Sequence, residues 1–380
     1  KNKKRIDSLW KQINWLNNHL ETHHGGNHLV ENLCSLLIGS LQFEGTKASS
    51  IYNNSLRKLK LELSSQILSD GGHEERSAVY TLLILDRLIE VACILSLNNK
   101  GKPEWLLIII KSMLEWASKV KIKGENLPNF NDSSINICPD INQVIFFGKN
   151  YLEKDICKSN GLRSQILELY LKELKTNKNI IHEKQFKTNK KIHRNSFITH
   201  LQATGWVILR PGHGWELAFK CGISCPKHLA AHAHSDMLSF DLWKNGKPFI
   251  ISSGVSTYEA GKIRSHERSM AAHNCLQLGR LEKTKINWIE SVDTWGSFRA
   301  GRKSNPKDWK QGKRLNWLWS SGSHDAFTSL NATHYRWIGV RFNKKDGFIL
   351  VIVDSIQNEI SLGCRSWIHF APDFQNLIKS

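Results

Sequence analysis

The spacing of apolar residues divides the chain into two parts. In residues 1–175, apolar side chains recur every three or four positions, which is the spacing of one face of an α-helix. Such stripes predict five successive helices followed by a loop and a sixth helix; they lie at 9–20, 29–41, 56–63, 79–89, 103–116 and 162–174. Because the connections are mostly short, neighbouring helices are expected to pair as antiparallel hairpins.

From residue 199 onward the period of the pattern changes to two, which is typical of β-strands. The predicted strands are 206–209, 215–219, 238–243, 249–252, 274–278, 288–292, 335–342 and 348–353. Strands at this density, separated by Gly and Asn turns, predict an antiparallel β-sandwich. The segment 176–198 is polar, and most of it is rich in lysine. We therefore expect a helical domain at 1–175, a linker at 176–198 and a β domain at 199–380.

Charge narrows the choice of partner. The net charge is +19, from 53 basic and 34 acidic residues, and such an excess attracts nucleic acid, anionic lipid or acidic polysaccharide. A compositional bias toward Lys, Asn and Ile accounts for the excess equally well, and the scattered lysines argue against nucleic acid. The sequence has no apolar run near the roughly 18–20 residues that cross a bilayer, so no transmembrane segment is expected.

The remaining bulk features concern processing and cysteine chemistry. The first methionine is Met113, which predicts a processed form or a fragment and leaves a lost signal peptide open. The eight cysteines include no CxxC pair, so a structural zinc finger is not expected. Only Cys221 and Cys225 lie close together, and independent thiols are favoured over a disulfide between them.

The strongest candidate for chemistry is the segment His232-Ala-His234-Ser-Asp236. On a strand, residues two positions apart point to the same face, so the two imidazoles are expected to lie together. His273, after the next strand and loop, is expected to converge on them. Converging imidazoles are costly to bury, which favours a functional role. The other histidines considered lack such support and are interpreted as loop or surface residues: His213, His228, His266 and His324.

The helical half has two candidate positions. Asn27 and His28 follow a Gly25-Gly26 turn at a predicted helix start, and Tyr80 lies one turn beyond the polar residues that open another helix. Helix N-termini carry unpaired N–H groups and favour anions. The two positions are about two helices apart, so both are expected to line the same end of the helical array.

Together these motifs resemble the heparinase II/III family of polysaccharide lyases, which includes alginate and oligoalginate lyases. The matching pieces occur in the family's order: Asn27-His28, Tyr80, a loop at 127–133 that ends in Asp132-Ser133, the His232–Asp236 segment, and Ala272-His273-Asn274. The resemblance implies an (α/α) toroid followed by an antiparallel β-sandwich. The toroid is short here, so its earlier helices are expected to be missing.

The resemblance also implies roles for these residues. A lyase removes the C5 proton of a uronic acid and expels the 4-linked sugar. In the family pattern Asn27, assisted by His28, neutralises the carboxylate next to C5. Tyr80 acts as the acid, and also as the base for one C5 epimer, while His232 is the base for the other. Elimination itself needs no cofactor.

Further site residues are expected from position. Tyr258 and Arg268 flank the loop between the two histidine motifs and are predicted to touch the substrate, Arg268 by pairing with a uronate or sulfate group. Glu75 and Arg76 are candidate substrate contacts near Tyr80, or else pair with each other at the helix start.

A structural zinc ion is left open by the resemblance. The family's ligands correspond to His234, His273 and an aspartate, but Ser252 occupies the aspartate position. Serine is a poor zinc ligand. A metal-free site, with His234 hydrogen-bonded to Ser252, is the simpler expectation.

Two functions follow. The first is a lyase that cleaves an acidic, uronic-acid-containing glycan, such as a glycosaminoglycan or alginate, by β-elimination. The second is a non-catalytic glycan-binding or surface-polysaccharide assembly protein that kept the fold. The family implies a location in the periplasm or cell envelope. The partner is an acidic polysaccharide, nucleic acid is not expected, and a homodimer is left open.

Overall fold

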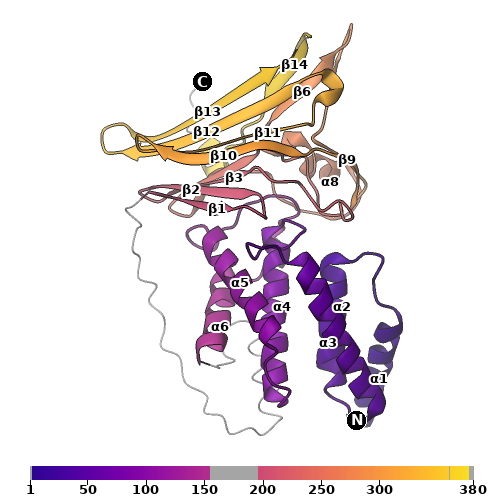
Figure 1. Cartoon of the computed structure of the whole chain (residues 1–380). Coiled ribbons are helices and arrows are strands. Elements are labelled where there is room, and N and C mark those ends of the chain that lie inside the picture. Colours follow the sequence, from indigo (N-terminus) through magenta and orange to yellow (C-terminus); the bar gives the residue numbers. More distant parts are fainter. Residues whose placement is uncertain (1, 155–195, 359, 376–380) are drawn as a thin grey trace. The chain divides into compact units, whose positions relative to one another are not determined.

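The computed structural model describes residues 2–154, 196–358 and 360–375 (Figure 1). These residues form two compact units, one helical and one built mainly of strands. Two short segments from the predicted helical domain, Glu75–Val79 and Lys119–Cys138, belong to the strand-rich unit. The predicted helix at 162–174 and residues 176–195 of the predicted linker lie outside the described residues.

The helical unit confirms the first five predicted helices and adds one. The helices are α1 (Asn2–Asn18), α2 (Gly26–Ser40), α3 (Thr46–Gln66), α4 (Ala78–Leu97), α5 (Glu104–Val120) and α6 (Ile141–Lys154). Helix α6 was not predicted, although its buried residues Ile141, Val144, Phe147 and Tyr151 recur at helical spacing. The toroidal arrangement stays a prediction. Among the described helices, none has the length and apolar character needed to span a membrane.

The strand-rich unit contains antiparallel sheets. A five-stranded sheet has the order β1-β2-β3-β4-β5 and a four-stranded sheet the order β10-β11-β12-β13. The first comprises β1 (Phe197–Leu201), β2 (Trp206–Gly212), β3 (Trp215–Lys220), β4 (Phe240–Lys244) and β5 (Lys247–Ile250). The second comprises β10 (Pro306–Arg314), β11 (Trp317–His324), β12 (Thr333–Asn343) and β13 (Gly347–Gln357).

Smaller elements complete this unit. Strands β14 (Leu362–Ser366), β6 (Leu276–Leu281) and β7 (Ile286–Trp288) form a three-stranded sheet in that order, and β8 (Val292–Trp295) pairs with β9 (Arg299–Lys303). The short helices are α8 (Lys262–Glu267) and α9 (Pro372–Gln375), with 3₁₀ turns at Ile135–Ile137, Met270–Ala272 and Thr328–Leu330.

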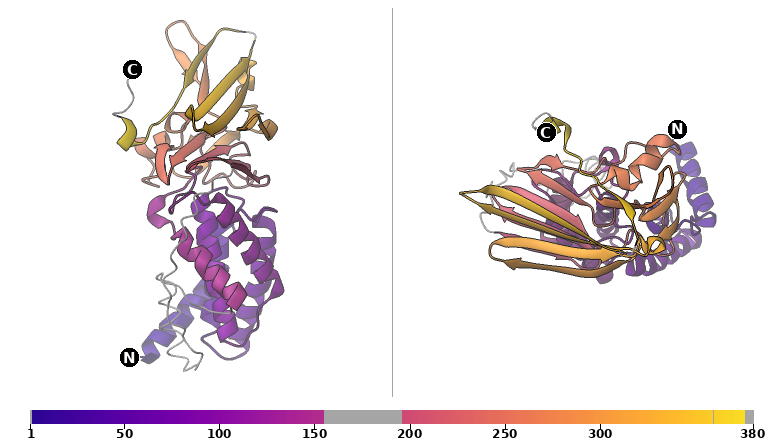
Figure 2. Two further views of the ribbon diagram at one scale, coloured as in Figure 1. Left: turned by 90° about the vertical axis from the view of Figure 1, so that its left-hand side faces the viewer. Right: turned by 90° about the horizontal axis from the view of Figure 1, so that it is seen from above.

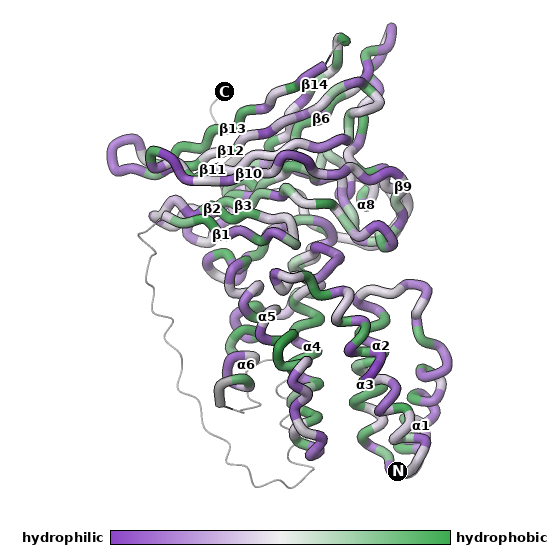
Figure 3. The backbone as a smooth tube through the Cα atoms, viewed as in Figure 1, coloured by the Kyte–Doolittle hydropathy of each residue, from purple (hydrophilic) through white to green (hydrophobic). Residues whose placement is uncertain are grey.

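The two larger sheets share one hydrophobic core. Figures 1 and 2 show the four-stranded sheet stacked over the five-stranded sheet. Leu217 and Phe240 from one sheet pack in the same cluster as Leu318, Ile338 and Val340 from the other, and all five are fully buried. Hydrophobic and hydrophilic residues are interleaved along these strands (Figure 3). Over most of β11 every second residue is buried, whereas nearly all residues of β2, β3 and β4 are buried. Helices followed by an antiparallel β unit are therefore confirmed.

Two predictions about this unit were wrong. The His232–Asp236 segment does not lie on a strand: it belongs to the irregular connection between β3 and β4, and β4 begins only at Phe240. His324 is not a surface or loop residue: it ends β11, is fully buried, and lies 3.3 Å (Nε2 to Nδ1) from His334. Strands β10 and β11 were also missed, because the inward positions of β11 are mostly small or polar residues rather than large apolar ones.

Candidate active site

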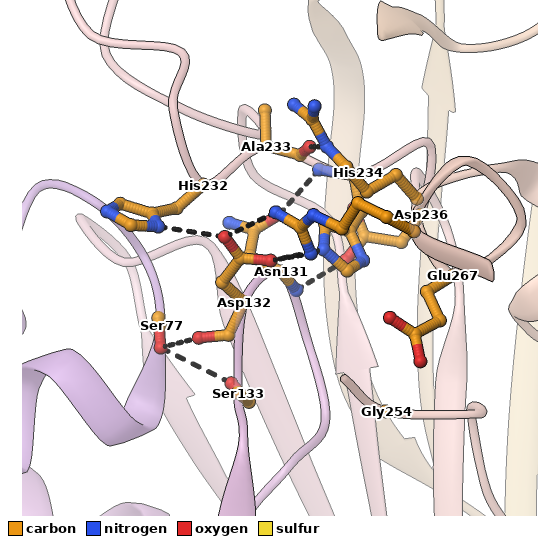
Figure 4. A network of polar contacts seen from close by, with 12 residues as sticks. Ser77, Asn131, Asp132, Ser133, His232, Ala233, His234, Asp236, Gly254 and Glu267 are labelled. Atoms are coloured by element: carbon orange, nitrogen blue, oxygen red, sulfur yellow. Dashed lines mark hydrogen bonds and ion pairs between the residues drawn. The ribbon is translucent and has the colours of Figure 1, made fainter. Parts of the chain in front are cut away.

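The candidate site is organised around one buried carboxylate, that of Asp132 (Figure 4). Its oxygens accept hydrogen bonds from His232 Nδ1 at 2.8 Å and from His234 Nε2 at 2.7 Å. The guanidinium of Arg264, on α8, donates to both oxygens, at 2.6 Å and 2.8 Å. Asp132, His234 and Arg264 are fully buried, and His232 is 5% exposed. The histidine pair of the sequence motif therefore meets on an aspartate from a distant loop.

Asn131 holds this loop in place. Its backbone is left-handed, with φ of 55°, a conformation that asparagine adopts more readily than most residues. Its side-chain NH₂ donates to the carbonyl oxygens of Glu75, Arg76 and Ser224, the last at 2.7 Å. Its side-chain oxygen accepts from the backbone N–H of His234 at 3.3 Å. One side chain thus joins the Asp132 loop, the Glu75–Val79 segment and the histidine motif.

A buried ion pair is hydrogen-bonded to Asn131. Lys220, at the end of β3, forms a salt bridge with Asp236, and both side chains are fully buried. Lys220 Nζ also donates to the Asn131 side-chain oxygen at 2.7 Å, and Asp236 accepts from the Asn131 backbone N–H at 3.0 Å. Ser77 completes the support by donating to the Asp132 carbonyl oxygen at 2.5 Å. Because these groups satisfy one another, the buried charges can be kept in place.

The network fixes the charge states of its members. Burial alone raises the pKa of Asp132, but hydrogen bonds from His232, His234 and Arg264 outweigh it and hold that pKa well below its ordinary value. Burial lowers the pKa of His234 despite its bond to Asp132, so this imidazole is neutral. For His232 burial is again the largest influence and lowers the pKa, but the hydrogen bond to Asp132 and the charge of Glu75 outweigh it and raise the pKa above its ordinary value.

The hydrogen bonds also assign the imidazole protons. Because the Asp132 carboxylate only accepts, His232 carries its proton on Nδ1 when neutral, which leaves a lone pair on Nε2. His232 Nε2 lies 3.6 Å from a carboxylate oxygen of Glu75. The carboxylate of Glu75 is therefore placed to stabilise a proton that arrives on Nε2.

Aromatic rings lie next to this histidine. The Phe298 ring contacts the His232 ring edge-to-face at 6.0 Å and stacks on Tyr258 at 5.8 Å. Arg264 lies over both rings, 5.2 Å from Tyr258 and 5.8 Å from Phe298. Phe298 is 45% exposed and Tyr258 is half-buried, so both rings are accessible from outside. Tyr258, a predicted substrate contact, thus lies in the same cluster as Arg264 and His232.

Arg268 has a different placement from the one predicted. It is fully buried, and its guanidinium donates to the carbonyl oxygens of Ala233 and Ser297 at 3.1 Å and 3.2 Å. Its own carbonyl oxygen accepts from Ser235 N–H at 2.9 Å. Burial lowers the pKa of Arg268 to about 10, and the nearby charge of Arg264 adds to the effect. Arg268 therefore braces the histidine loop in this structure and presents no exposed surface to a glycan.

Glu75 and Arg76 are both buried in the strand-rich unit. Glu75 is 3% exposed and faces His232, and Arg76 is 8% exposed and donates to the Ala203 carbonyl oxygen at 3.2 Å. Arg76 has a left-handed backbone, with φ of 52°. Glu75 is thus in contact with the histidine motif.

The described residues do not fit the zinc ion implied by the family resemblance. His234 Nδ1 and His273 Nε2 lie 3.2 Å apart, but a zinc site needs at least a third protein ligand. Ser252 instead donates its hydroxyl to Asp241 at 3.0 Å, so the expected bond between Ser252 and His234 is wrong. Within the described residues, no group of three His, Cys, Asp or Glu side chains is arranged to hold a metal ion.

The contact between His234 and His273 has a simpler explanation. Because His234 donates through Nε2 to Asp132, its Nδ1 is an acceptor, and His273 donates to it through Nε2. Burial lowers the pKa of His273 to about 3, so this imidazole is neutral near neutral pH. The convergence of the three histidines is confirmed, as a chain of hydrogen bonds that ends on Asp132.

The helical unit carries the other predicted catalytic residues. Asn27 and His28 lie in the first turn of α2, which two left-handed glycines, Gly25 and Gly26, precede and open. Tyr80 lies in the first turn of α4 and is half-buried. An ion pair of 2.7 Å between Glu31 of α2 and Arg87 of α4 joins the two helices.

His28 differs from the others in its exposure. Its side chain is 54% exposed and lies 3.5 Å from the Glu21 carboxylate. Asn27 is half-buried. Both placements leave the side chains accessible at the start of α2.

Four residues of the network were not predicted as site residues: Asn131, Asp132, Lys220 and Arg264. Only Asp132 had a sequence signal, the Asp-Ser ending of the 127–133 loop. Arg264 lies 132 positions from Asp132, and a lysine or arginine in a strongly basic chain carries no local sign of its partner. The prediction that Cys221 and Cys225 are independent thiols is confirmed, since both are free.

Comparison with known proteins gives consistent matches. The family model "Heparinase II/III N-terminus" matches residues 6–147, and the model "Heparinase II/III-like, C-terminal" matches residues 194–379. A heparin-sulfate lyase of Bacteroides thetaiotaomicron is 26% identical over 276 residues, which cover 67% of this chain and 37% of that protein.

Solved structures show the same fold. The crystal structure of a heparinase III superposes with a TM-score of 0.59 at 20% identity, covering 90% of this chain and 49% of the other. A heparan sulfate lyase from Pedobacter heparinus superposes with a TM-score of 0.56 at 18% identity, covering 92% and 48%. The chain therefore spans about half the length of these structures and less of the curated relative.

Proposed function

The chain belongs to the heparinase II/III family, and on that premise we propose that it cleaves an acidic, uronic-acid-containing glycan by β-elimination. The observation that carries the proposal is the hydrogen bond between Asp132 and His232 Nδ1, which leaves Nε2 as the nitrogen able to take a proton. The net charge of +19 suits a polyanionic substrate.

The chemistry requires a base at C5. The C5 proton of a uronate is weakly acidic, so the base must be well oriented and the enolate-like intermediate must be stabilised. His232 meets the first requirement, because Asp132 fixes the ring and the raised pKa of His232 strengthens it as a base. Glu75, 3.6 Å from Nε2, favours the protonated imidazole that results.

The helical unit supplies the other proposed roles. Asn27, with His28 beside it, neutralises the uronate carboxylate from the start of α2, where the positive end of the helix dipole favours anions. Tyr80 donates the proton to the leaving oxygen, and acts as the base for one C5 epimer while His232 serves the other. Both Asn27 and Tyr80 lie in first turns of helices that the Glu31–Arg87 ion pair joins.

The aromatic rings next to His232 suit a sugar. Pyranose rings present C–H groups that pack on aromatic faces, and Phe298 and Tyr258 are accessible rings stacked on each other. Tyr258 keeps its predicted role as a substrate contact in this proposal. The negative charge of Asp132 is balanced by Arg264, so it does not repel an acidic glycan.

The proposal includes no cofactor. Elimination needs only an acid, a base and stabilisation of the carboxylate, and the residues above provide all three. The zinc donor set is incomplete, because Ser252 stands in place of the carboxylate and is bonded to Asp241. A periplasmic or cell-envelope location follows from the proposed substrate class alone.

The test is the ultraviolet absorbance of the unsaturated uronate that β-elimination creates. The intact protein is incubated with heparan sulfate, heparin, hyaluronan and alginate, beside the Tyr80→Phe variant. The proposal predicts a rising band with at least one glycan and its loss in the variant. If a folded chain binds a glycan with no band from any member of the panel, the protein is a binding or assembly protein and the proposal is wrong.

A further inference from the structure

The outer face of the four-stranded sheet carries a row of tryptophans that the proposed active site does not use. The strand register places Trp317 opposite Arg314 of β10, and Trp337 opposite Ser321. Trp319 lies between these pairs, opposite Gly339. Because successive strand residues point to opposite faces, these rings lie on the face away from the shared core.

Arg336 shows that the tryptophans and the candidate active site lie on opposite sides of the four-stranded sheet. Arg336, the neighbour of Trp337, points inward and donates to the carbonyl oxygens of Leu238 and Asn274, which belong to the segments around the histidine motifs. Trp337 therefore points away from the candidate active site. Any ligand on the tryptophan face is held apart from Asp132 by the thickness of the sheet.

Glycines let the rings lie flat on the sheet. A Cβ on Gly312 would come within 2.9 Å of the Trp319 ring, and a Cβ on Gly339 within 2.1 Å of the Trp337 ring. Ring centroids are 6.5 Å apart for Trp319 and Trp337, with an angle of 24° between the planes, and 6.3 Å apart for Trp317 and Trp337. The result is a platform of three rings, two of them nearly parallel.

The platform is accessible. All three tryptophans are only partly buried, and a shallow groove of about 350 Å³ runs over them, lined also by Arg314 and Leu315. Leu315, at the tip of the β10–β11 hairpin, is 83% exposed, and Val353 beside the groove is 51% exposed. Ring surface and aliphatic side chains are therefore exposed together on this face.

Cations edge the platform. Arg314 lies directly opposite Trp317, and Lys310 lies in the same row as Trp337. Arg341 lies 5.0 Å over the Trp317 ring and pairs with Asp346. Among the described residues, Lys310 and Arg314 take part in no salt bridge. Asp308, at the far end of the face, is hydrogen-bonded to Ser323. The free charge on this face is therefore positive.

We propose that the platform of Trp317, Trp319 and Trp337 is a second glycan-binding surface, which holds an acidic polysaccharide chain by stacking sugar rings on the tryptophans and pairing its acidic groups with Arg314 and Lys310. The ring spacing is comparable to the length of one sugar unit, and accessible aromatic faces suit the C–H faces of a sugar. The unpaired cations select acidic over neutral chains. The inference shares a glycan class with the proposed function but none of its residues.

This inference is tested by measuring the binding of heparan sulfate and alginate, with titration calorimetry and with quenching of tryptophan fluorescence. The full chain carries Tyr80→Phe throughout, so that no cleavage occurs. Trp319→Ala and Trp337→Ala are each expected to weaken binding about tenfold and to reduce the quenching. Arg314→Glu changes only an exposed side chain and is expected to weaken binding of the acidic glycans. Trp15→Ala, which removes a 61% exposed tryptophan from α1, is the matched control and should bind like its parent.

The outcomes separate the platform from the lyase activity. Unchanged affinity and quenching in the two tryptophan variants and in Arg314→Glu would overturn the platform, whether or not the intact chain cleaves glycans. Equal binding of a neutral β-glucan would overturn the role of the cations. A dimer that Trp319→Ala converts to a monomer in sedimentation, with glycan binding unchanged, would show a second copy on this face and also overturn the inference. Platform binding without cleavage would leave it standing and refute only the proposed function.

Discussion

Asp132 and His232 lie 100 positions apart in the sequence, yet the Asp132 carboxylate and His232 Nδ1 are joined by a hydrogen bond of 2.8 Å. This bond fixes the tautomer of the imidazole and directs Nε2 toward Glu75. The same carboxylate binds His234 and Arg264, so one aspartate orients the proposed base and is neutralised at the same time.

Asp132→Asn is the sharpest test of this arrangement. The amide keeps the shape of the side chain but donates on one side, so His232 loses the acceptor that fixes its Nδ1 proton. For the C5 epimer that His232 serves, we expect kcat of cleavage to fall by about 100-fold or more, with a smaller change in KM. The variant also leaves Arg264 buried beside a neutral group, so its thermal unfolding must be measured alongside activity.

A matched control separates orientation from general loss of charge. Asp293 pairs with Arg302 at 3.0 Å but is 52% exposed, and an exposed pair contributes little to stability. Asp293→Asn should keep both activity and melting temperature. Equal activity of Asp132→Asn and the intact protein would contradict the proposed role of the carboxylate.

The buried pair of Lys220 and Asp236 is expected to be essential for stability. Lys220→Met leaves Asp236 charged and unpaired in the interior, which costs about 3–5 kcal/mol of unfolding free energy. Adding Asp236→Asn removes the unpaired charge and keeps an oxygen that accepts from Asn131 N–H, so the double variant should recover part of the loss. Denaturant unfolding of the intact protein, the two single variants and the double variant measures the coupling between the two residues. Strictly additive losses of unfolding free energy would show that the pair does not act as a unit.

Asp354 on β13, which is half-buried, makes stability depend on pH. Burial alone raises its pKa, but hydrogen bonds from His334 at 2.7 Å and from Arg336 outweigh burial and hold the pKa well below its ordinary value. A carboxyl whose folded pKa is depressed stabilises the fold fully above its unfolded pKa of about 4. This stability is lost as the pH falls from there toward the folded pKa.

Asp354→Asn therefore has a predictable signature. At pH 7 it should lower the unfolding free energy by about 3–5 kcal/mol, because Arg336 loses its partner in the interior. The difference from the intact protein should shrink as the pH is lowered from 5 to 3, in denaturant unfolding followed by circular dichroism. Asp346→Asn, which changes a 39% exposed partner of Arg341, is the control. A difference that stays constant with pH would refute the depressed pKa.

The sequence pattern was sufficient where the hydrophobic period was strong. The stripes of α2 to α5 and the alternation of β2, β3, β12 and β13 each predicted an element of the right type. Strand β11 escaped because its inward face holds Ser320, Gly322 and His324, which give no apolar alternation. Polar residues at buried positions are stabilised by partners far away in the sequence, and no local pattern shows those partners.

The candidate site, like the fold, was predicted only in part from the sequence. The histidines were found because their residue types and spacing are rare, and their convergence was predicted correctly. Their support on a strand was not: the segment lies on a loop held by Asn131 and by Arg268. Arg268 was assigned to the substrate because an arginine near a histidine motif suggests anion binding. Its burial could not be seen from spacing.

Metal analysis tests the inference that no zinc ion binds where Ser252 stands in place of the expected aspartate. Because this serine donates to Asp241 and leaves only two imidazoles, we expect zinc well below one ion per chain after exposure to zinc and desalting, by elemental analysis. A chelator should leave both the melting temperature and the rate of glycan cleavage unchanged. One zinc per chain, lost on chelation together with stability, would show that another ligand completes the site.

The most direct test of the account is the rate at which His232→Ala produces the unsaturated-uronate absorbance from a glycan that the intact protein cleaves. Titration of the same glycan, together with thermal unfolding, shows that the variant is folded and still binds. For the C5 epimer that His232 serves, we expect kcat to fall by about 100-fold or more while binding is kept, because the base that Asp132 orients is gone. A folded variant that cleaves every substrate of the intact protein at the same rate would contradict the account.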